Sequence, residues 1–340
     1  MHRMRILAAV AVAVALLSGY SVYWFIVAAQ LERGIDNWVA FQRQAGLTVD
    51  FERTPVTGFP LEFRTTFRKP HIAGATAGQD IDWQGPDVVG SVSPLNLHTM
   101  TFSGPGHHTI DLGGGPATLD AGDLTVRLAF DGAGQVSSLA VTLGDLHVTL
   151  PDDRTVVAAS GTVSLSAAPS PPKSDADPLL QFDAAAQELK LPEGTVLLTA
   201  DPLSEAKIAG AVKGPFPLLP LRQALVSWRD AGGTVEIKSF AAAQATLALS
   251  GSATIALDDN LQPIVAANVN ARGLGPTIDL LASQRRIYPE DALKMKLFVK
   301  AAERDTKDGY KEVATGITVQ GSYLSWGPFK LAKVPPIQWP

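Results

Sequence analysis

A single long apolar segment near the N-terminus constrains this chain more than any other feature. Ile6–Ala29 consists almost wholly of Ala, Val, Leu, Ile and aromatic residues, interrupted only by Ser18, Gly19 and Ser21. As a helix it would span about 36 Å, more than the roughly 30 Å hydrocarbon core of a bilayer. The chain has no second segment of this kind. We therefore predict one transmembrane signal-anchor, residues 1–30.

The residues that flank this segment predict its orientation. Basic side chains precede it and none follows it directly, which favours a cytoplasmic N-terminus. Aromatic rings gather in its distal half, and such rings prefer the headgroup level of a membrane. We expect this end to meet the outer interface. The basic flank is His2, Arg3 and Arg5, and the aromatic residues are Tyr20, Tyr23, Trp24 and Phe25.

Two other interpretations of the segment remain open. Val27 and Ala29 fit the small-residue rule for signal-peptide cleavage after Ala29. A signal core is usually about 7–15 residues long, however, and this segment is longer and carries bulky rings near its end. A buried core helix is the third interpretation. A retained anchor is the one we favour.

Residues 31–46 predict an amphipathic stalk that continues the helix outward. Apolar residues recur at helical spacing in Leu31–Gln44, and Gly46 supplies a common helix end. The stalk is expected to dock on the following domain; the alternative is that it lies along the membrane surface. The apolar positions are Ile35, Trp38, Val39 and Phe41.

Beyond Gly46 the hydrophobic period changes from 3.6 to 2, which is typical of strands with one apolar face. A slip of one residue at Gly144–Asp145 predicts a β-bulge. Residues 47–340 are therefore expected to form a mainly β domain with few helices, built on a large, curved and mostly antiparallel sheet. The alternating segments are 47–52, 61–68, 124–131, 141–150 and 247–257.

The turns agree with antiparallel pairing. Asp131–Gly134 and Asp258–Asn260 separate pairs of strands, and both hairpins place Gln after the turn. This likeness suggests a repeated meander unit, although chance similarity is the alternative. The Pro- and Ser-rich residues 167–178 predict an exposed loop within one sheet, or else a linker between two lobes.

Three helices are predicted in the second half of the chain. Leu218–Arg229 lies between prolines and Gly232, and Thr277–Arg285 and Glu290–Ala302 follow it. A strand at Val313–Val319 and the tail Tyr323–Phe329 complete the chain.

Composition excludes several classes of protein. The chain has no cysteine, so it has no disulfide framework, thiolate zinc site or lipid-modified cysteine. Lys and Arg number 28 against 33 Asp and Glu, which gives a net charge of −5 with no basic stripe. Nucleic acid is therefore not expected as a partner.

No group of residues predicts catalysis or metal binding. His107 and His108 are adjacent on an expected strand and would point to opposite faces, so with His98 they make a poor metal site. The pairs Asp152–Asp153 and Asp258–Asp259 occur in turns, where Asp is favoured for its side-chain hydrogen bonds.

Two further motifs lack the context that chemistry requires. Gly113–Gly115 has no helix after it to form a phosphate loop. No Ser occurs in a Gly-x-Ser-x-Gly elbow. We expect no catalytic, cofactor-binding or metal site and no enzyme activity, and we assign no ligand-binding residues.

A large sheet with few helices must cover its apolar face with something. The sheet and the three predicted helices could close a core. Alternatively, an open apolar groove could hold acyl chains.

Short motifs along nearly the whole chain resemble the uncharacterised bacterial domain-of-unknown-function family 2125. They combine aromatic residues with glycine and proline turns. The residues that carry the resemblance are Tyr23–Phe25, Leu31, Glu32, Gly34, Ile35, Trp38, Gly46–Leu47, Gly58–Pro60, Trp83, Pro86, Ser93–Pro94, Trp228, Gly232–Gly233, Val235, Ile237, the 247–257 strand with its Asp258 turn, and Trp326–Pro328.

The resemblance implies a Gram-negative inner-membrane protein with its C-terminal domain in the periplasm, but it supplies no reaction or substrate. In general shape such a chain is similar to AsmA-like envelope proteins, some of which are linked to lipid movement. The AsmA-like proteins that bridge membranes are much longer. We expect the inner membrane as a partner and the binding of lipid or another hydrophobic envelope component. The alternative is a non-enzymatic scaffold that binds an envelope protein.

Overall fold

A computed structural model describes residues 2–76, 79–192, 201–285, 287–306, 309–326 and 329–339, and within these ranges it describes side chains from residue 14 onward, except at 76, 79, 329, 331 and 332. The chain forms two compact units. Unit 1 comprises residues 1–119 and 123–135, and unit 2 comprises residues 120–122 and 136–340. Both are built mainly from antiparallel strands, so the predicted fold class is confirmed.

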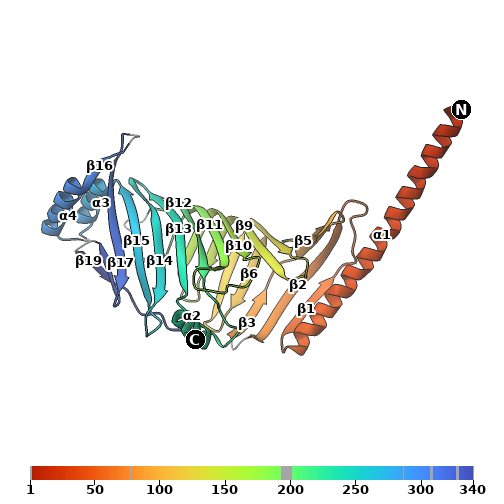
Figure 1. Ribbon diagram of the computed structural model, residues 1–340, viewed down its shortest axis with the longest axis horizontal. Helices are drawn as coiled ribbons and strands as arrows, with labels where there is room; N and C mark the ends of the chain where they lie inside the picture. Colours follow the sequence, from red (N-terminus) through yellow and green to blue (C-terminus); the bar gives the residue numbers. More distant parts are fainter. Residues whose placement is uncertain are drawn as a thin grey trace. The chain divides into compact units, whose positions relative to one another are not determined.

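Unit 1 combines one long helix with a small antiparallel sheet (Figure 1). β2 is its central strand, because it pairs with β1 along one edge and with β4 and then β3 along the other. β5 joins β4, β8 joins β5, and β6 joins β3. The elements are α1 (His2–Gln44), β1 (Thr48–Arg53), β2 (Phe63–Thr76), β3 (Gln79–Gln84), β4 (Val88–Ser93), β5 (Asn96–Ser103), β6 (Gly106–Asp111), β7 (Pro116–Ala121) and β8 (Asp123–Phe130).

α1 includes both the predicted membrane segment and the predicted stalk, without a break. The stalk docks on the sheet, where Asp36 forms an ion pair with Arg53 at 3.0 Å. Trp38 and Phe41 were expected to pack, but they are exposed. The packed stripe instead runs through Leu31 and Ile35. Phe41, six residues after Ile35, falls on another side of the helix.

Docking begins earlier in α1 than the sequence predicts. Trp24, Val27 and Ala28 are buried against Phe63 of β2, although they belong to the segment assigned to the membrane. The distal part of that segment is therefore covered by protein in unit 1. An apolar helix face satisfies lipid and a protein core equally well, so composition alone could not separate the two environments.

Unit 2 is a succession of antiparallel strands that pair largely in chain order, with a helical pair between β15 and β16 (Figure 1). α3 and α4 pack together beside β17, and α2 lies near one end of the strands. The elements are β9 (Val136–Thr149), β10 (Thr155–Ala167), β11 (Pro178–Leu189), β12 (Leu203–Lys213), α2 (Leu221–Asp230), β13 (Thr234–Gln244), β14 (Leu247–Leu257), β15 (Pro263–Arg272), α3 (Leu274–Ser283), α4 (Pro289–Ala302), β16 (Glu303–Asp305), β17 (Lys311–Gln320), β18 (Tyr323–Trp326) and β19 (Phe329–Lys333).

The Pro- and Ser-rich segment connects β10 to β11, and these two strands pair directly with each other. The boundary between the two compact units lies elsewhere, around residues 120–136. The segment is therefore the loop of a hairpin. Gly327 and Pro328, which contribute to the family resemblance, lie outside the described residues.

The structure corrects the predicted bulge in β9. Asp145 has a positive φ of 48°, which marks a local kink. β9 and β10 nevertheless keep one register on both sides of it, with Gly144 opposite Ser160 and Leu146 opposite Ala158. Against β10 no extra residue is inserted, and the slip in the hydrophobic pattern coincides with the kink at Asp145.

The two hairpin turns share the same hydrogen bonds. One carboxylate oxygen of Asp131 accepts from the backbone N–H groups two and four residues on, and Asp258 does likewise. The turn at Asp111 does so as well, although it lies outside the proposed repeat. The likeness of the two hairpins therefore follows from the chemistry of Asp turns and needs no repeated unit.

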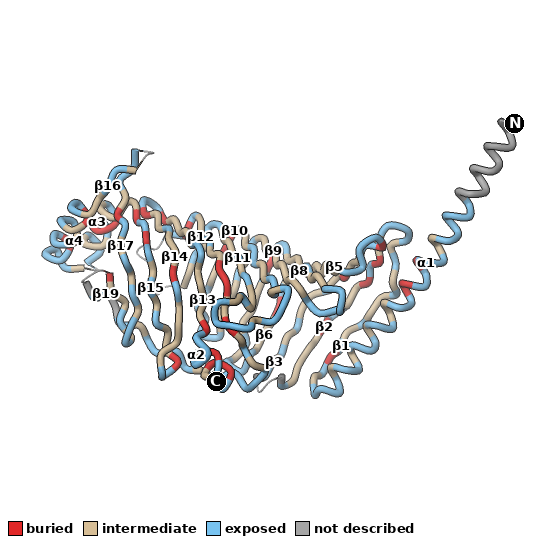
Figure 2. The backbone as a smooth tube through the Cα atoms, viewed as in Figure 1, coloured by how far each residue is buried: buried red, intermediate tan, exposed pale blue. Residues whose placement is uncertain are grey.

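The core of unit 2 is concentrated at its helical end. Val313 and Trp326 of the sheet pack against Ile278 of α3 and Val299 of α4. The ring of Trp326 makes an edge contact with Phe298 at 5.4 Å between centroids. Figure 2 shows that full burial gathers in α2, α3, α4 and parts of the adjacent strands, whereas most of the sheet is half-buried.

Candidate functional site

The strand register of unit 2 aligns apolar residues into a continuous row. Directly opposed residues of an antiparallel pair point to the same side of the sheet. Starting at Val141 of β9, successive partners can be followed across eight strands to Thr315 of β17. This first row is Val141, Val163, Ala184, Ile208, Phe240, Gly251, Val269 and Thr315.

Two parallel rows flank the first, and we call the three together the apolar face. The second row is Leu139, Leu165, Phe182, Gly210, Ile237, Ala253, Ala267, Ile317 and Trp326. The third row is Leu143, Gly161, Ala186, Ala206, Ala242, Leu249, Ala271 and Val313. No residue in these rows carries a charge, and Thr315 alone has a polar side chain.

The residues between the first and third rows point to the opposite side of the sheet, because side chains alternate along a strand. This intervening row contains hydroxyl, amide and ammonium groups. Its members are Thr142, Thr162, Ala185, Lys207, Ala241, Ser250, Asn270 and Ala314. The sheet of unit 2 therefore has one charge-free face and one polar face.

Two glycines make room for aromatic rings on the apolar face. A Cβ atom on Gly210 would lie 2.7 Å from Cζ of Phe182, and one on Gly251 would lie 2.9 Å from Cζ of Phe240. Real Cβ contacts are not this short, so each ring lies over the bare backbone of its glycine partner. The face is flattened as a result, because both rings lie on the sheet.

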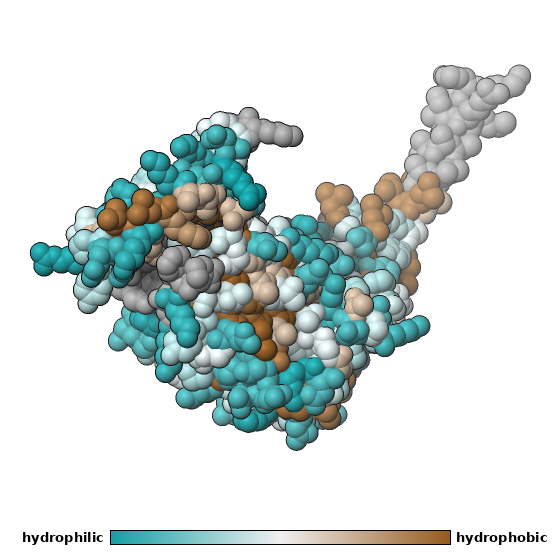
Figure 3. All heavy atoms as spheres, turned by 60° about the vertical axis from the view of Figure 1, so that its left-hand side comes forward, coloured by the Kyte–Doolittle hydropathy of each residue, from teal (hydrophilic) through white to brown (hydrophobic). Residues whose placement is uncertain are grey.

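The apolar face is covered unevenly by the described residues of unit 2. At the helical end, Val313 and Trp326 are 2% and 7% exposed. From β9 to β13, the non-glycine members of the three rows are half-buried or exposed, and Val163 is 36% exposed. Figure 3, which brings the α3–α4 side forward, shows apolar side chains at the surface among hydrophilic ones.

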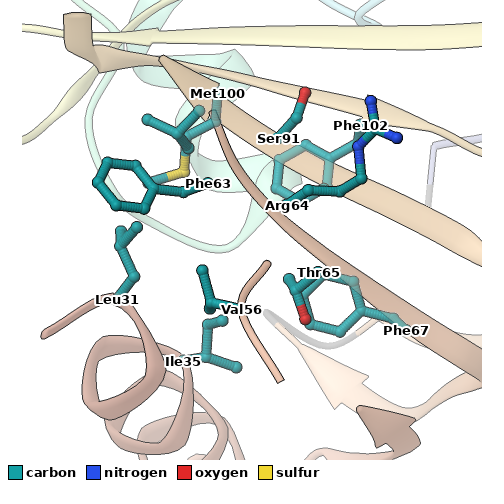
Figure 4. Close-up of a pocket in the computed structure, with 12 residues that line it drawn as sticks. Leu31, Ile35, Val56, Phe63, Arg64, Thr65, Phe67, Ser91, Met100 and Phe102 are labelled. Carbon is teal, nitrogen blue, oxygen red and sulfur yellow. The ribbon is translucent and has the colours of Figure 1, made fainter. Parts of the chain in front are cut away.

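Unit 1 contains a smaller apolar cavity between α1 and the sheet. Figure 4 shows Leu31 and Ile35 of α1 facing Val56, Phe63 and Met100. Its volume is about 80 Å³. A cavity of about 150 Å³ is what holds one benzene molecule, so this space is too small for an acyl chain. The apolar face of unit 2 is the larger candidate.

The histidines singled out in the sequence do not converge. His108 is buried, where its Nδ1 accepts from Trp83 Nε1 at 3.4 Å and its Nε2 lies 2.8 Å from the carbonyl oxygen of Gly104. His107 is exposed on the same strand, and His98 is exposed on β5, which does not pair with that strand. No group of three metal-binding side chains occurs among the described residues.

The acidic and glycine-rich motifs have local structural roles. The hydrogen bond from Arg154 lowers the pKa of Asp152, which is a surface group in a turn. Gly113 and Gly115 donate their N–H groups to Asp111, so these groups are not directed at a phosphate. Asp152, Gly113 and Gly115 thus take part in local turn structure.

Comparison with known families assigns the chain to a group. A family model described as an uncharacterized protein conserved in bacteria, DUF2125, matches residues 24–335. The chain belongs to this family. No curated protein and no solved structure was found to match it. The DUF2125 match begins at Trp24, the first buried residue among the described side chains of α1, and includes every row of the apolar face.

The sequence predicted the existence of the apolar face but only part of its extent. Alternation identified β9 and β14, a strand was predicted at β17, and the Asp258–Asn260 turn predicted β15 as the partner of β14, whereas β10 to β13 were not predicted as strands. These strands use small residues at many face positions, such as Ala184, Ala206 and Ala242. The strand register identifies these small residues as part of the apolar face, because each pairs across the sheet with a larger apolar residue or with another alanine.

Proposed function

We propose that this DUF2125-family chain is a single-pass inner-membrane protein that binds the acyl chains of a lipid on its apolar face. In this proposal the N-terminus is cytoplasmic, unit 2 is periplasmic, and the protein binds without catalysing a reaction. The observation that carries the proposal is the apolar face itself: three register-aligned rows without a charge, only half-buried over five strands.

A retained anchor is supported by the packing of α1. Cleavage after Ala29 would remove Trp24, Val27 and Ala28, whose burial covers the ring of Phe63. Phe63 is 2% exposed when these residues are present. Removing them would expose the apolar ring of Phe63 to water, which is unfavourable. The family match also begins before the cleavage position. One helix of the described chain is long and apolar enough to cross a membrane.

The dimensions of the apolar face suit acyl chains. Over the five strands β9 to β13, where the face is only half-buried, a row extends about 19 Å, since neighbouring strands lie about 4.8 Å apart. One leaflet contributes about half of the roughly 30 Å hydrocarbon core, so a row is longer than one acyl chain. Burying apolar surface stabilises binding by roughly 25 cal/mol per Å², whereas a charged group on the face would oppose it.

The test uses adjacent residues that point to opposite faces. Val163→Glu places a carboxylate on the apolar face, and Thr162→Glu places the same group on the polar face one residue away. Both sites are exposed, so both variants are expected to fold. The three full-length proteins are extracted from membranes in mild detergent and analysed by native mass spectrometry.

The proposal predicts lipid bound to the wild type and to Thr162→Glu, and reduced lipid on Val163→Glu. A wild type without bound lipid, or equal retention by both variants, would contradict it. Specific retention of a protein that Val163→Glu loses would favour the alternative, an envelope scaffold.

A further inference from the structure

Aromatic side chains of α1 and two loops of unit 1 meet at one end of that unit. Tyr20 Oη donates to the carbonyl oxygen of Pro60 at 2.5 Å, and Tyr23 Oη donates to that of Pro94 at 3.0 Å. Phe59 lies against three rings of the helix, with centroid distances of 5.5 to 6.3 Å. The loop before β2 and the turn between β4 and β5 are therefore fixed beside this part of α1.

The tips of these two loops carry large apolar side chains that the fold leaves in solvent. Leu61 is 82% exposed, Leu95 is 92% exposed and Phe59 is 47% exposed. We call these three residues the tip residues. Exposed leucines that occur singly need no explanation, but a group of them around an apolar helix indicates a contact surface.

The length of α1 indicates what this surface contacts. The apolar segment starts at Ile6, and the fourteen residues from Ile6 to Gly19 span about 21 Å. A hydrocarbon core of about 30 Å needs about 20 residues, so the helix leaves it near Phe25. Tyr20 and Tyr23 then lie within about 10 Å of the outer boundary of the core, so the loops bonded to them reach the outer leaflet.

We propose that the tip residues of unit 1 insert into the outer leaflet of the membrane that α1 spans. This inference rests on the membrane anchor of the proposed function. It adds that unit 1 contacts the bilayer directly and is not separated from it by an exposed length of α1. The aromatic cluster then serves both as packing for unit 1 and as an interfacial belt.

The rest of unit 1 extends away from the membrane. From Trp24 to Arg43, α1 rises about 28 Å, and it runs beside the sheet from the Phe63 contact to an ion pair between Arg43 and Asp50. Leu112 directly follows Asp111 of β6, which pairs with Asp82 of β3. Asp82 in turn pairs with Ala73, which is near the end of β2 farthest from Phe63. Since ten residues of strand separate that level from Phe63, Leu112 lies about 33 Å from the tip residues along the strands.

The absence of cysteine makes a labelling test direct. Single variants Leu61→Cys, Leu95→Cys, Leu112→Cys and Leu17→Cys of the full chain are labelled with the environment-sensitive dye NBD. They are reconstituted into vesicles of phosphatidylethanolamine and phosphatidylglycerol that contain a nitroxide-labelled lipid. Leu112 is the control, because it is an exposed leucine of unit 1 at the opposite end. Leu17 reports on the anchor.

The inference predicts blue-shifted emission and strong nitroxide quenching at positions 17, 61 and 95, with water-like emission at 112. Water-like emission at 61 and 95, with quenching at 17, would overturn the inference while leaving the anchor in place. Water-like emission at 17 as well would overturn both the inference and the membrane anchor. Quenching at 112 equal to that at 61 would also overturn the inference, because contact would then not be specific to the tips.

Discussion

Replacing Trp24 with alanine should destabilise unit 1 much more than a change at the surface of the same helix. Trp24 is 2% exposed, stacks on Phe63 at 5.0 Å and makes edge contacts with Phe25 and Phe59. A buried aromatic side chain removes roughly 150–250 Å² from water, which at about 25 cal/mol per Å² gives about 4–6 kcal/mol. Measured Trp-to-Ala costs of about 3–5 kcal/mol agree with this range.

Trp38→Ala is the matched control, because Trp38 lies on α1 but is 47% exposed. Its loss should change the free energy of unfolding by about 0.5 kcal/mol or less. Hydrogen exchange of the β2 and β4 amides, measured by mass spectrometry on the full chain in detergent, reports the free energy of opening unit 1. A cost below about 1 kcal/mol for Trp24→Ala, or equal costs for both variants, would refute the packing of α1 against the sheet.

Two further predictions concern unit 2. Gly251→Ala should cost about 1–3 kcal/mol in the free energy of unfolding, because its Cβ would lie 2.0 Å from the carbonyl oxygen of Asn268. Gly275→Ala, which meets no atom within 4 Å on α3, should instead be neutral or stabilising, and equal urea midpoints for the two variants would contradict the close approach. Backbone hydrogen bonds, above all from the N–H of Lys173, lower the pKa of Asp177 below its ordinary value of 3.8. The ionised carboxylate should therefore order the loop at pH values above 3.8, and this order should be lost as the pH falls through the lowered pKa. Asp177→Asn should increase protease cleavage of this loop at pH 7, and unchanged cleavage would show that the carboxylate does not order it.

The strands and helices that the sequence predicts share a strong local signal. The segment at 247–257 alternates Leu, Ala and Ile with Ser and Thr, and β14 has the same bounds. Helix predictions at 218–229 and 290–302 agree with α2 and α4 to within three residues at each end. In these segments the hydrophobic period and the terminal prolines act over a few residues, so sequence alone is sufficient.

The features that the sequence did not predict depend on long-range pairing. Ala184 and Ala206 belong to the apolar face only because their cross-strand partners place them there. Trp24 was assigned to the membrane because its neighbours along the chain are apolar, whereas its main contact, Phe63, is 39 residues away. Distant partners of this kind decide which side of an apolar segment meets protein.

The most direct test of the central claim is residue-specific photocrosslinking on the two faces of unit 2 in living cells. Benzoylphenylalanine replaces Phe182 or Phe240 on the apolar face, and Gln181 or Ala241 on the polar face, in strands β11 and β13. Mass spectrometry then identifies what is attached at each position. Lipid adducts at 182 and 240, but not at 181 and 241, are the predicted result. Adducts to protein alone, or lipid attached equally on both faces, would contradict acyl-chain binding on the apolar face.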